Sequence, residues 1–199
     1  ATDSKAVAYN LQTAEKTFAT FAVSVSNPGG HSSRPRKDNA IYQLAADLQK
    51  FSSFEFPVQY SEQTLASFKF TGQQIGGELG AAMQRFADNP KDAAAAAIIA
   101  ADPEYVGTLR TTCVATMLSG GHAENALPQL ATATINCRIF PGVSVESVRL
   151  KIAEVIADSG ATVKEVGTSF ASDASPLRDD VLQAVRKAVD ANFVGLPVI

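Results

Sequence analysis

The sequence predicts an α+β domain built on a split βαββαβ unit, the ferredoxin-like arrangement in which a four-stranded antiparallel sheet carries helices on one face. Two observations predict it. Strand-like and helix-like segments alternate in the required order over residues 17–166. Each helix-like segment also has a single apolar stripe, so it can cover one face of a sheet. A helical insertion after the first helix, residues 52–108, interrupts the unit.

Composition limits the function classes. The chain has 199 residues, of which 46% are hydrophobic, enough for one substantial core. Its net charge of -3 and the lack of a basic stripe argue against a nucleic-acid partner. No apolar run approaches the roughly 20 residues of a membrane span, and ATDSKAVAYN does not have the pattern of a signal peptide. We expect a soluble protein with no membrane partner, and its compartment stays open.

The first strand and helix flank a glycine-rich loop. Residues 17–27 alternate between apolar and small polar side chains, which predicts a strand with one buried face. The loop GGHSSRP, residues 29–35, follows it. Asp38 is then predicted to cap a helix. The apolar stripe of that helix is Ile41, Leu44, Ala45 and Leu48.

The insertion and the second half follow the same logic. Within the insertion, one helical face carries Leu79, Met83 and Phe86, and a later alanine-rich run packs through Ile98 and Ile99. Two segments rich in threonine, valine and isoleucine, residues 109–118 and 130–140, predict antiparallel strands joined by the connector SGGHAENALPQ.

A second sheet-covering helix and a last strand complete the unit. Ser144 is predicted to cap this helix, and Gly160 to end it. Its apolar stripe is Val148, Ile152, Val155 and Ile156. Residues 161–166 predict the fourth strand, and Ser175-Pro176 is predicted to open a further helix. Because the chain stops at the apolar GLPVI, we expect it to be a piece of a longer protein.

Two common hydrolytic arrangements do not match. GGHSSRP is not the G-x-S-x-G elbow of a serine hydrolase. Two histidines without a Glu-Glu pair or an H-x-D motif cannot build a two-metal centre. His122-Ala123-Glu124 matches H-x-E, but the P-C-x-x-C that accompanies it in zinc deaminases is missing. We therefore expect no metal ligand here and interpret His122 as a solvated loop residue.

Three single groups could still serve a site. A neutral His31 imidazole and the Asn125 amide can donate hydrogen bonds to an oxyanion, and the Arg138 guanidinium matches a carboxylate bidentately. Together they could bind a molecule with a carbonyl group and a free carboxylate. On composition alone the plainer interpretations stay open: a solvated loop histidine, a turn-forming asparagine and a solvated arginine on a strand.

A family resemblance favours the first interpretation. GGHSSRP followed by DNAIYQLAADL, and later RTTCVATMLSGGHAENALPQLATATINCRIFPGVSVESV, resembles the lid or dimerisation domain of di-zinc metallopeptidases. That family includes carboxypeptidase S, aminoacylase, glutamate carboxypeptidase and succinyl-diaminopimelate desuccinylase, and the carboxypeptidase S branch is the most similar.

The resemblance implies site roles. His31 matches the catalytic lid histidine that reaches an active site, commonly that of the partner subunit, and stabilises the scissile carbonyl oxygen. Asn125 and Arg138 match the residues that contact the substrate and grip its terminal carboxylate. Gly29 and Gly30 would let the backbone turn so that the imidazole projects, and we count Gly30 among the substrate-binding residues.

The resemblance also implies an organisation. Residues 1–16 would end a catalytic-domain segment, residues 17–172 form the lid, and residues 173–199 return to the catalytic domain. The two zinc ions and the general base would belong to that missing domain, so this segment alone would be inactive. The substrate would be a peptide or N-acyl amino acid with a free carboxylate, and the lid would form a homodimer. The alternative is a non-catalytic self-association or protein-interaction module.

The resemblance bears on the cysteines as well. Cys113 and Cys137 lie on strands that should be neighbours, so an exported parent could pair them in a disulfide.

Overall fold

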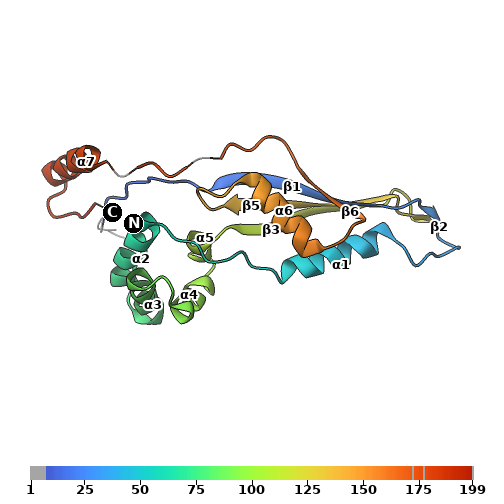
Figure 1. Ribbon diagram of the computed structural model, residues 1–199, viewed down its shortest axis with the longest axis horizontal. Coiled ribbons are helices and arrows are strands. Elements are labelled where there is room, and N and C mark those ends of the chain that lie inside the picture. The colour runs from blue at the N-terminus through green and yellow to red at the C-terminus, as the bar shows by residue number, and fades with distance from the viewer. Residues whose placement is uncertain (1–7, 172, 177, 199) are drawn as a thin grey trace, which may run out of the picture. The chain divides into compact units, whose positions relative to one another are not determined.

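A computed structural model describes residues 8–171, 173–176 and 178–198, which form two compact units (Figure 1). The sheet unit comprises residues 16–57 and the described residues within 110–172. The helical unit comprises residues 58–109 and the described parts of residues 1–15 and 173–199. None of the described helices combines the length and apolar character needed to cross a membrane.

The sheet unit contains the predicted four-stranded antiparallel sheet. Its strands are β1 (Thr17–Ser26), β3 (Thr112–Gly120), β5 (Leu130–Ile139) and β6 (Ala161–Glu165). They lie in the order β3-β5-β1-β6, and each neighbouring pair is antiparallel. This is the strand order of a split βαββαβ unit, so the predicted fold class is confirmed. β3 and β6 are the edge strands.

Two helices, α1 (Ala40–Ser52) and α6 (Val145–Ile156), cover one face of this sheet. Alternate residues of the two central strands point into the core beneath them, as the period of two requires. The buried strand residues are Ala19, Phe21, Val23, Val25, Ala131, Ala133, Ile135, Cys137 and Ile139. The opposite face is open and carries hydroxyl groups, such as the pair Ser24 Oγ and Thr132 Oγ1 at 2.9 Å.

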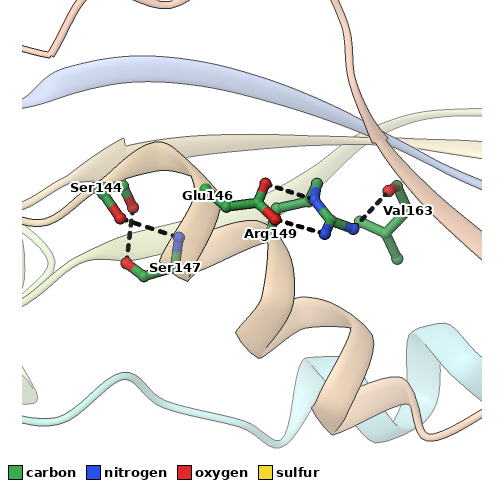
Figure 2. Close-up of polar contacts among 5 residues, drawn as sticks. All are labelled: Ser144, Glu146, Ser147, Arg149 and Val163. Atoms are coloured by element: carbon green, nitrogen blue, oxygen red, sulfur yellow. Dashed lines mark hydrogen bonds and ion pairs between the residues drawn. The ribbon is translucent and has the colours of Figure 1, made fainter.

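Local side-chain bonds fix α6 in place, as Figure 2 shows. The predicted cap is confirmed, since Ser144 Oγ accepts from the Ser147 N–H at 3.1 Å. Arg149 pairs with Glu146 through bonds of 2.7 and 2.6 Å and donates to the Val163 carbonyl at 3.2 Å. The helix is thereby tied to β6. It ends at Ile156, four residues before the predicted Gly160, where Ala157 takes a left-handed φ of 48°.

The structure corrects two details of α1. Asn39, rather than Asp38, is the N-cap, and its Oδ1 accepts from the backbone N–H of Ile41 at 2.9 Å. The buried face is also rotated from the predicted stripe, since Ile41 and Ala45 are exposed while Asp47 and Phe51 are buried. The spacing of apolar residues predicts that a carboxylate lies on the solvent side of a helix. The burial of Asp47 could therefore not be predicted from the apolar stripe.

The insertion folds as four helices with a core of their own. They are α2 (Glu62–Ile75), α3 (Gly77–Asp88), α4 (Ala93–Ala100) and α5 (Val106–Leu109). The predicted Met83, Phe86 and Ile99 are buried. α2 and α3 approach closely because two glycines face each other: a Cβ on Gly72 would lie 2.6 Å from the Gly80 carbonyl oxygen.

Two further predicted boundaries were wrong. The strand expected to begin at residue 109 begins at Thr112, because α5 occupies the preceding turn. The last helix, α7 (Asp179–Asn192), begins after the predicted Ser175-Pro176. Asp179 and Asp180 lie in its first turn, where their negative charges interact favourably with the helix dipole.

Candidate functional site

The two loops singled out by their sequence pair with each other. β2 (Gly30–His31) and β4 (Ala126–Leu127) form a separate two-stranded antiparallel ladder, with His31 opposite Ala126 and Gly30 opposite Leu127. The Ser32 N–H extends it by donating to the Asn125 carbonyl at 2.9 Å. This β2–β4 ladder lies beyond the end of the sheet where β1 ends and β5 begins (Figure 1). His31 and Asn125 are therefore brought together.

The ladder requires glycine at its start. Gly29 has a φ of 77°, a conformation that other residues rarely adopt. A Cβ on Gly29 would also lie 2.7 Å from Gln129 Cγ and 3.3 Å from the Leu127 carbonyl oxygen. Gly30 has a φ of 153°. The two glycines thus allow the predicted turn of the backbone, and they also allow the two loops to approach each other.

The His31 ring has a defined donor. Its Nδ1 accepts from the Ser33 N–H at 3.1 Å and lies 2.9 Å from Ser33 Oγ. A backbone N–H can only donate, so Nδ1 carries no proton, and the neutral ring holds its proton on Nε2. His31 is exposed. Its Nε2–H is therefore free to donate a hydrogen bond to a substrate oxygen.

A carboxylate joins the two ends of the histidine loop. Asp38 pairs bidentately with Arg36 at 2.9 and 2.7 Å and accepts from Asn27 Nδ2 at 3.1 Å. Asn27 Oδ1 in turn accepts from the Gly29 N–H at 3.0 Å. The hydrogen bonds from Arg36 lower the pKa of Asp38 to about 2, so this carboxylate stays charged at neutral pH. Asp38, which the sequence predicted to cap the helix, instead holds the two ends of the loop together.

Arg138 lies elsewhere on the sheet unit. It is exposed on the open face of β5, opposite Phe18 on one side and Thr112 on the other. Its guanidinium carbon lies 4.8 Å from the centre of the Phe18 ring, a cation–π contact. No described residue gives Arg138 a hydrogen bond or an ion pair. The fork is therefore available to an anion.

The length of the sheet separates Arg138 from the ladder. Leu130 pairs with Ser26 at the ladder end, and Arg138 follows eight positions later along β5. At roughly 3.3 Å per residue the separation is about 25 Å. A single chain thus brings His31 close to Asn125 but not to Arg138. The distance between Arg138 and the ladder is longer than an amino acid can span.

The remaining candidate residues are quickly placed. His122 is exposed in the connector, which confirms it as a solvated loop residue. Within the described part of the chain, no group of three or more histidine, cysteine or acidic residues could hold a metal ion. Cys113 and Cys137 face each other across β3 and β5 and form a disulfide, a pairing that the sequence had left open.

Comparisons with known sequences agree with the motifs. A family model described as the peptidase dimerisation domain matches residues 13–163. The human N-fatty-acyl-amino acid synthase/hydrolase PM20D1 is 26% identical over 187 residues, which cover 92% of this chain and 37% of that protein. A probable carboxypeptidase S-like 2 of Dictyostelium discoideum is 28% identical over 155 residues, covering 76% and 29%. The chain thus spans about a third of the length of these relatives.

Solved structures share the fold. The M20 family metallo-carboxypeptidase Sso-CP2 from Sulfolobus solfataricus matches with a TM-score of 0.57 at 12% identity, covering 96% of this chain and 53% of that one. Human carnosine dipeptidase 1 matches with a TM-score of 0.54 at 13% identity, covering 99% and 46%. At such low identity these matches show the fold alone.

Proposed function

Because this chain belongs to the M20 peptidase dimerisation domain family, we propose that it is the lid of a zinc-dependent exopeptidase or N-acyl amino acid hydrolase. Its relatives are named as carboxypeptidase-like proteins and N-fatty-acyl-amino acid hydrolases. The substrate is a peptide or N-acyl amino acid with a free carboxylate. The division into residues 1–16, 17–172 and 173–199 stays a prediction.

His31 is the catalytic contribution of this lid. Its Nε2–H, set by the Ser33 N–H bond to Nδ1, donates to the scissile carbonyl oxygen as negative charge develops there. Asn125, fastened beside it by the ladder, contacts the substrate. Arg138 binds the carboxylate through its unpaired fork. Gly30 contributes by letting the ladder backbone come close to the ligand.

The separation along β5 is the observation that carries this proposal. One chain cannot place His31 and Arg138 on one small substrate, so the complete site takes the histidine from one copy and the arginine from the other. A closed two-fold dimer gives each site one of each. The family description of a dimerisation domain supports this arrangement.

The sheet topology supplies a route to such a dimer. Edge strand β3 runs from Thr112, opposite Arg138, to Gly120, opposite Ala131 near the ladder. Pairing β3 antiparallel with the same strand of a second copy reverses its direction, so the ladder end of the partner comes beside Arg138. Three strand spacings, about 15 Å, then separate β5 from its counterpart, and the side chains shorten this further.

The β3 edge also has the surface of an interface. Val114, Met117 and Leu118 are 60, 70 and 67% exposed. An uncovered edge with apolar side chains is a template for pairing with another chain. The other edge strand, β6, is only five residues long.

The zinc ions of this proposal belong to a catalytic domain outside this segment. The described residues offer no ligand set, so no step is derived through the metal here. When bound, zinc polarises a carbonyl group and activates water. The lid residues orient the substrate beneath it and complete its oxyanion contacts.

Substituting His31→Ala in the full-length enzyme tests this function, with His122→Ala as the matched control. We expect kcat to fall by about 100-fold with the dimer unchanged, the usual cost of losing one oxyanion donor. The exposed loop residue His122 should leave kcat unaffected. An unchanged kcat in His31→Ala would favour the alternative of a non-catalytic self-association or interaction module.

A further inference from the structure

A lysine lies beside the arginine on the open face of the sheet. Thr17 is buried and Phe18 is exposed opposite Arg138, so strand alternation places the preceding Lys16 on the same face as Phe18. Residues two positions apart on adjacent strands are diagonal neighbours. Lys16 is therefore a diagonal neighbour of Arg138.

The lysine amine is held in place rather than free in solvent. Lys16 is half-buried, and its Nζ donates to the Arg110 carbonyl at 2.6 Å. Arg110 precedes β3, so this bond directs the lysine side chain toward the strands beside β1. The Arg110 guanidinium is itself paired with Glu55. The Arg138 cation is thus one of the charges that act on the amine, whereas the nearby Arg110 guanidinium is already paired with a carboxylate.

The two cations act on each other. Burial, together with the positive charge of Arg138, lowers the pKa of Lys16 to about 8. Arg138 has no acidic partner among the described residues. Two neighbouring cations of this kind are both stabilised when one anion lies between them.

We propose that Lys16 and Arg138 together form the subsite for the substrate carboxylate. The Arg138 fork binds it bidentately, and the Lys16 ammonium supplies a second, compact positive charge. This inference rests on the function proposed above for Arg138 and adds Lys16 as a residue that determines carboxylate affinity.

The subsite makes carboxylate binding depend on pH. Lys16 is charged well below pH 8 and loses its proton above it, whereas Arg138 stays charged throughout. A bound carboxylate must in turn raise the pKa of Lys16, because linkage is reciprocal. Affinity should therefore decrease across the titration of Lys16.

The chain itself allows the test, with N-benzoylglycine as the probe and its methyl ester as the neutral control. Binding is followed by NMR titration of the backbone amides at about pH 6.5 and about pH 9.5, on either side of the Lys16 titration. We compare Lys16→Met, Lys16→Arg and Arg138→Met. Lys164→Met, an exposed lysine on the same face of β6, is the matched control.

The expected pattern separates the residues. The acid, but not the ester, should shift the amides of residues 16–18 and 138, and the dissociation constant should rise about fivefold at the higher pH, the scale of one partly exposed charge pair. Lys16→Met should bind about fivefold more weakly at the lower pH and Lys16→Arg should keep its affinity, both without pH dependence. Lys164→Met should follow the wild type.

Two results would overturn parts of the account separately. If Lys16→Met keeps the wild-type affinity and pH profile while Arg138→Met abolishes the preference for the acid, Lys16 is not part of the subsite and the role of Arg138 stands. If Arg138→Met keeps that preference, the carboxylate role proposed for Arg138 fails as well. Retention of the β1 and β5 amide signals shows that each variant is folded.

Discussion

The backbone N–H of Ser32 donates to the carbonyl oxygen of Asn125 at 2.9 Å, which fastens the histidine loop to the asparagine loop. The bond uses only main-chain atoms, so neither side chain is consumed by it. Both the His31 imidazole and the Asn125 amide stay available for a ligand. The geometry of the candidate site is therefore set by the backbone, and it should respond to changes in backbone conformation.

The first prediction concerns the tautomer of His31. Because the Ser33 N–H donates to Nδ1, ¹⁵N NMR at a pH where the ring is neutral should show the proton on Nε2. His122 makes no side-chain hydrogen bond within the described residues and serves as the internal reference for a freely exchanging ring. A proton on Nδ1 of His31, or the same tautomer mixture in both rings, would contradict the proposed donor.

A glycine pair separates backbone strain from steric contact. Gly29 and Gly121 have nearly equal φ values of 77° and 76°, but only Gly29 has neighbours where a Cβ would be. Because a Cβ is strained in the left-handed conformation, substituting either glycine by alanine should lower the free energy of unfolding by about 1–2 kcal/mol. Gly29→Ala should also speed amide exchange at Ser32, whose bond closes the ladder. Equal effects of both variants on that amide would show that the contact is unimportant.

Periodicity was enough to predict the strands of the main sheet and the presence of its two helices, although not the buried face of α1. The alternation in residues 17–27 and the stripe from Val148 to Ile156 correspond to β1 and α6. The β2–β4 ladder has two residues in each strand, too short for any period to appear. The sequence indicates this ladder only through the glycines of GGH. Glycines there suggest a turn or a close contact of the backbone, but not which segment it contacts.

The candidate site residues were selected by chemistry and motif, but the sequence did not predict how they lie relative to one another. His31, Asn125 and Arg138 looked like one constellation in the sequence. Only the strand register shows that Arg138 is at the far end of the sheet from the other two. Lys16 was missed because a lysine before a strand is ordinary in sequence, and its environment depends on Arg138, far away along the chain.

Asp47 was also missed, and it makes the fold sensitive to pH. Its Oδ2 is buried without a hydrogen-bond partner, and Oδ1 lies 3.4 Å from Lys50 Nζ. Burial and the neighbouring Asp158 carboxylate raise the pKa of Asp47. Bonds from Gln43 at 2.6 Å and the Gly160 N–H at 2.8 Å lower the pKa of Asp158. The two carboxyl groups therefore favour sharing one proton.

Substituting Asp47→Asn should reveal this pair. A raised folded pKa contributes stability that is present below the unfolded value and lost as pH rises through the folded value. The variant should thus gain stability over the wild type as pH rises from about 4, the ordinary pKa of an aspartate. Denaturant unfolding across pH measures it, with a substitution of the exposed loop residue, Glu124→Gln, as the matched control. A gain independent of pH would contradict the shared proton.

The β3 edge should govern self-association. Met117→Lys places a charge on the exposed edge strand, which natural sheets use to prevent edge pairing. We expect sedimentation equilibrium to show a weakened dimer. Thr162→Lys puts the same charge on the other edge strand, β6, and should leave association unchanged. Loss of the dimer in Thr162→Lys but not in Met117→Lys would move the interface to β6.

Subunit complementation tests most directly whether one site is shared between two copies. Full-length subunits carrying His31→Ala are mixed with subunits carrying Arg138→Met, each inactive alone. Half of the randomly formed dimers are mixed, and one of their two sites regains both residues, so the account predicts roughly a quarter of wild-type activity. Activity no higher than that of the separate variants would show that His31 and Arg138 do not meet across a dimer, and the shared site would have to be abandoned.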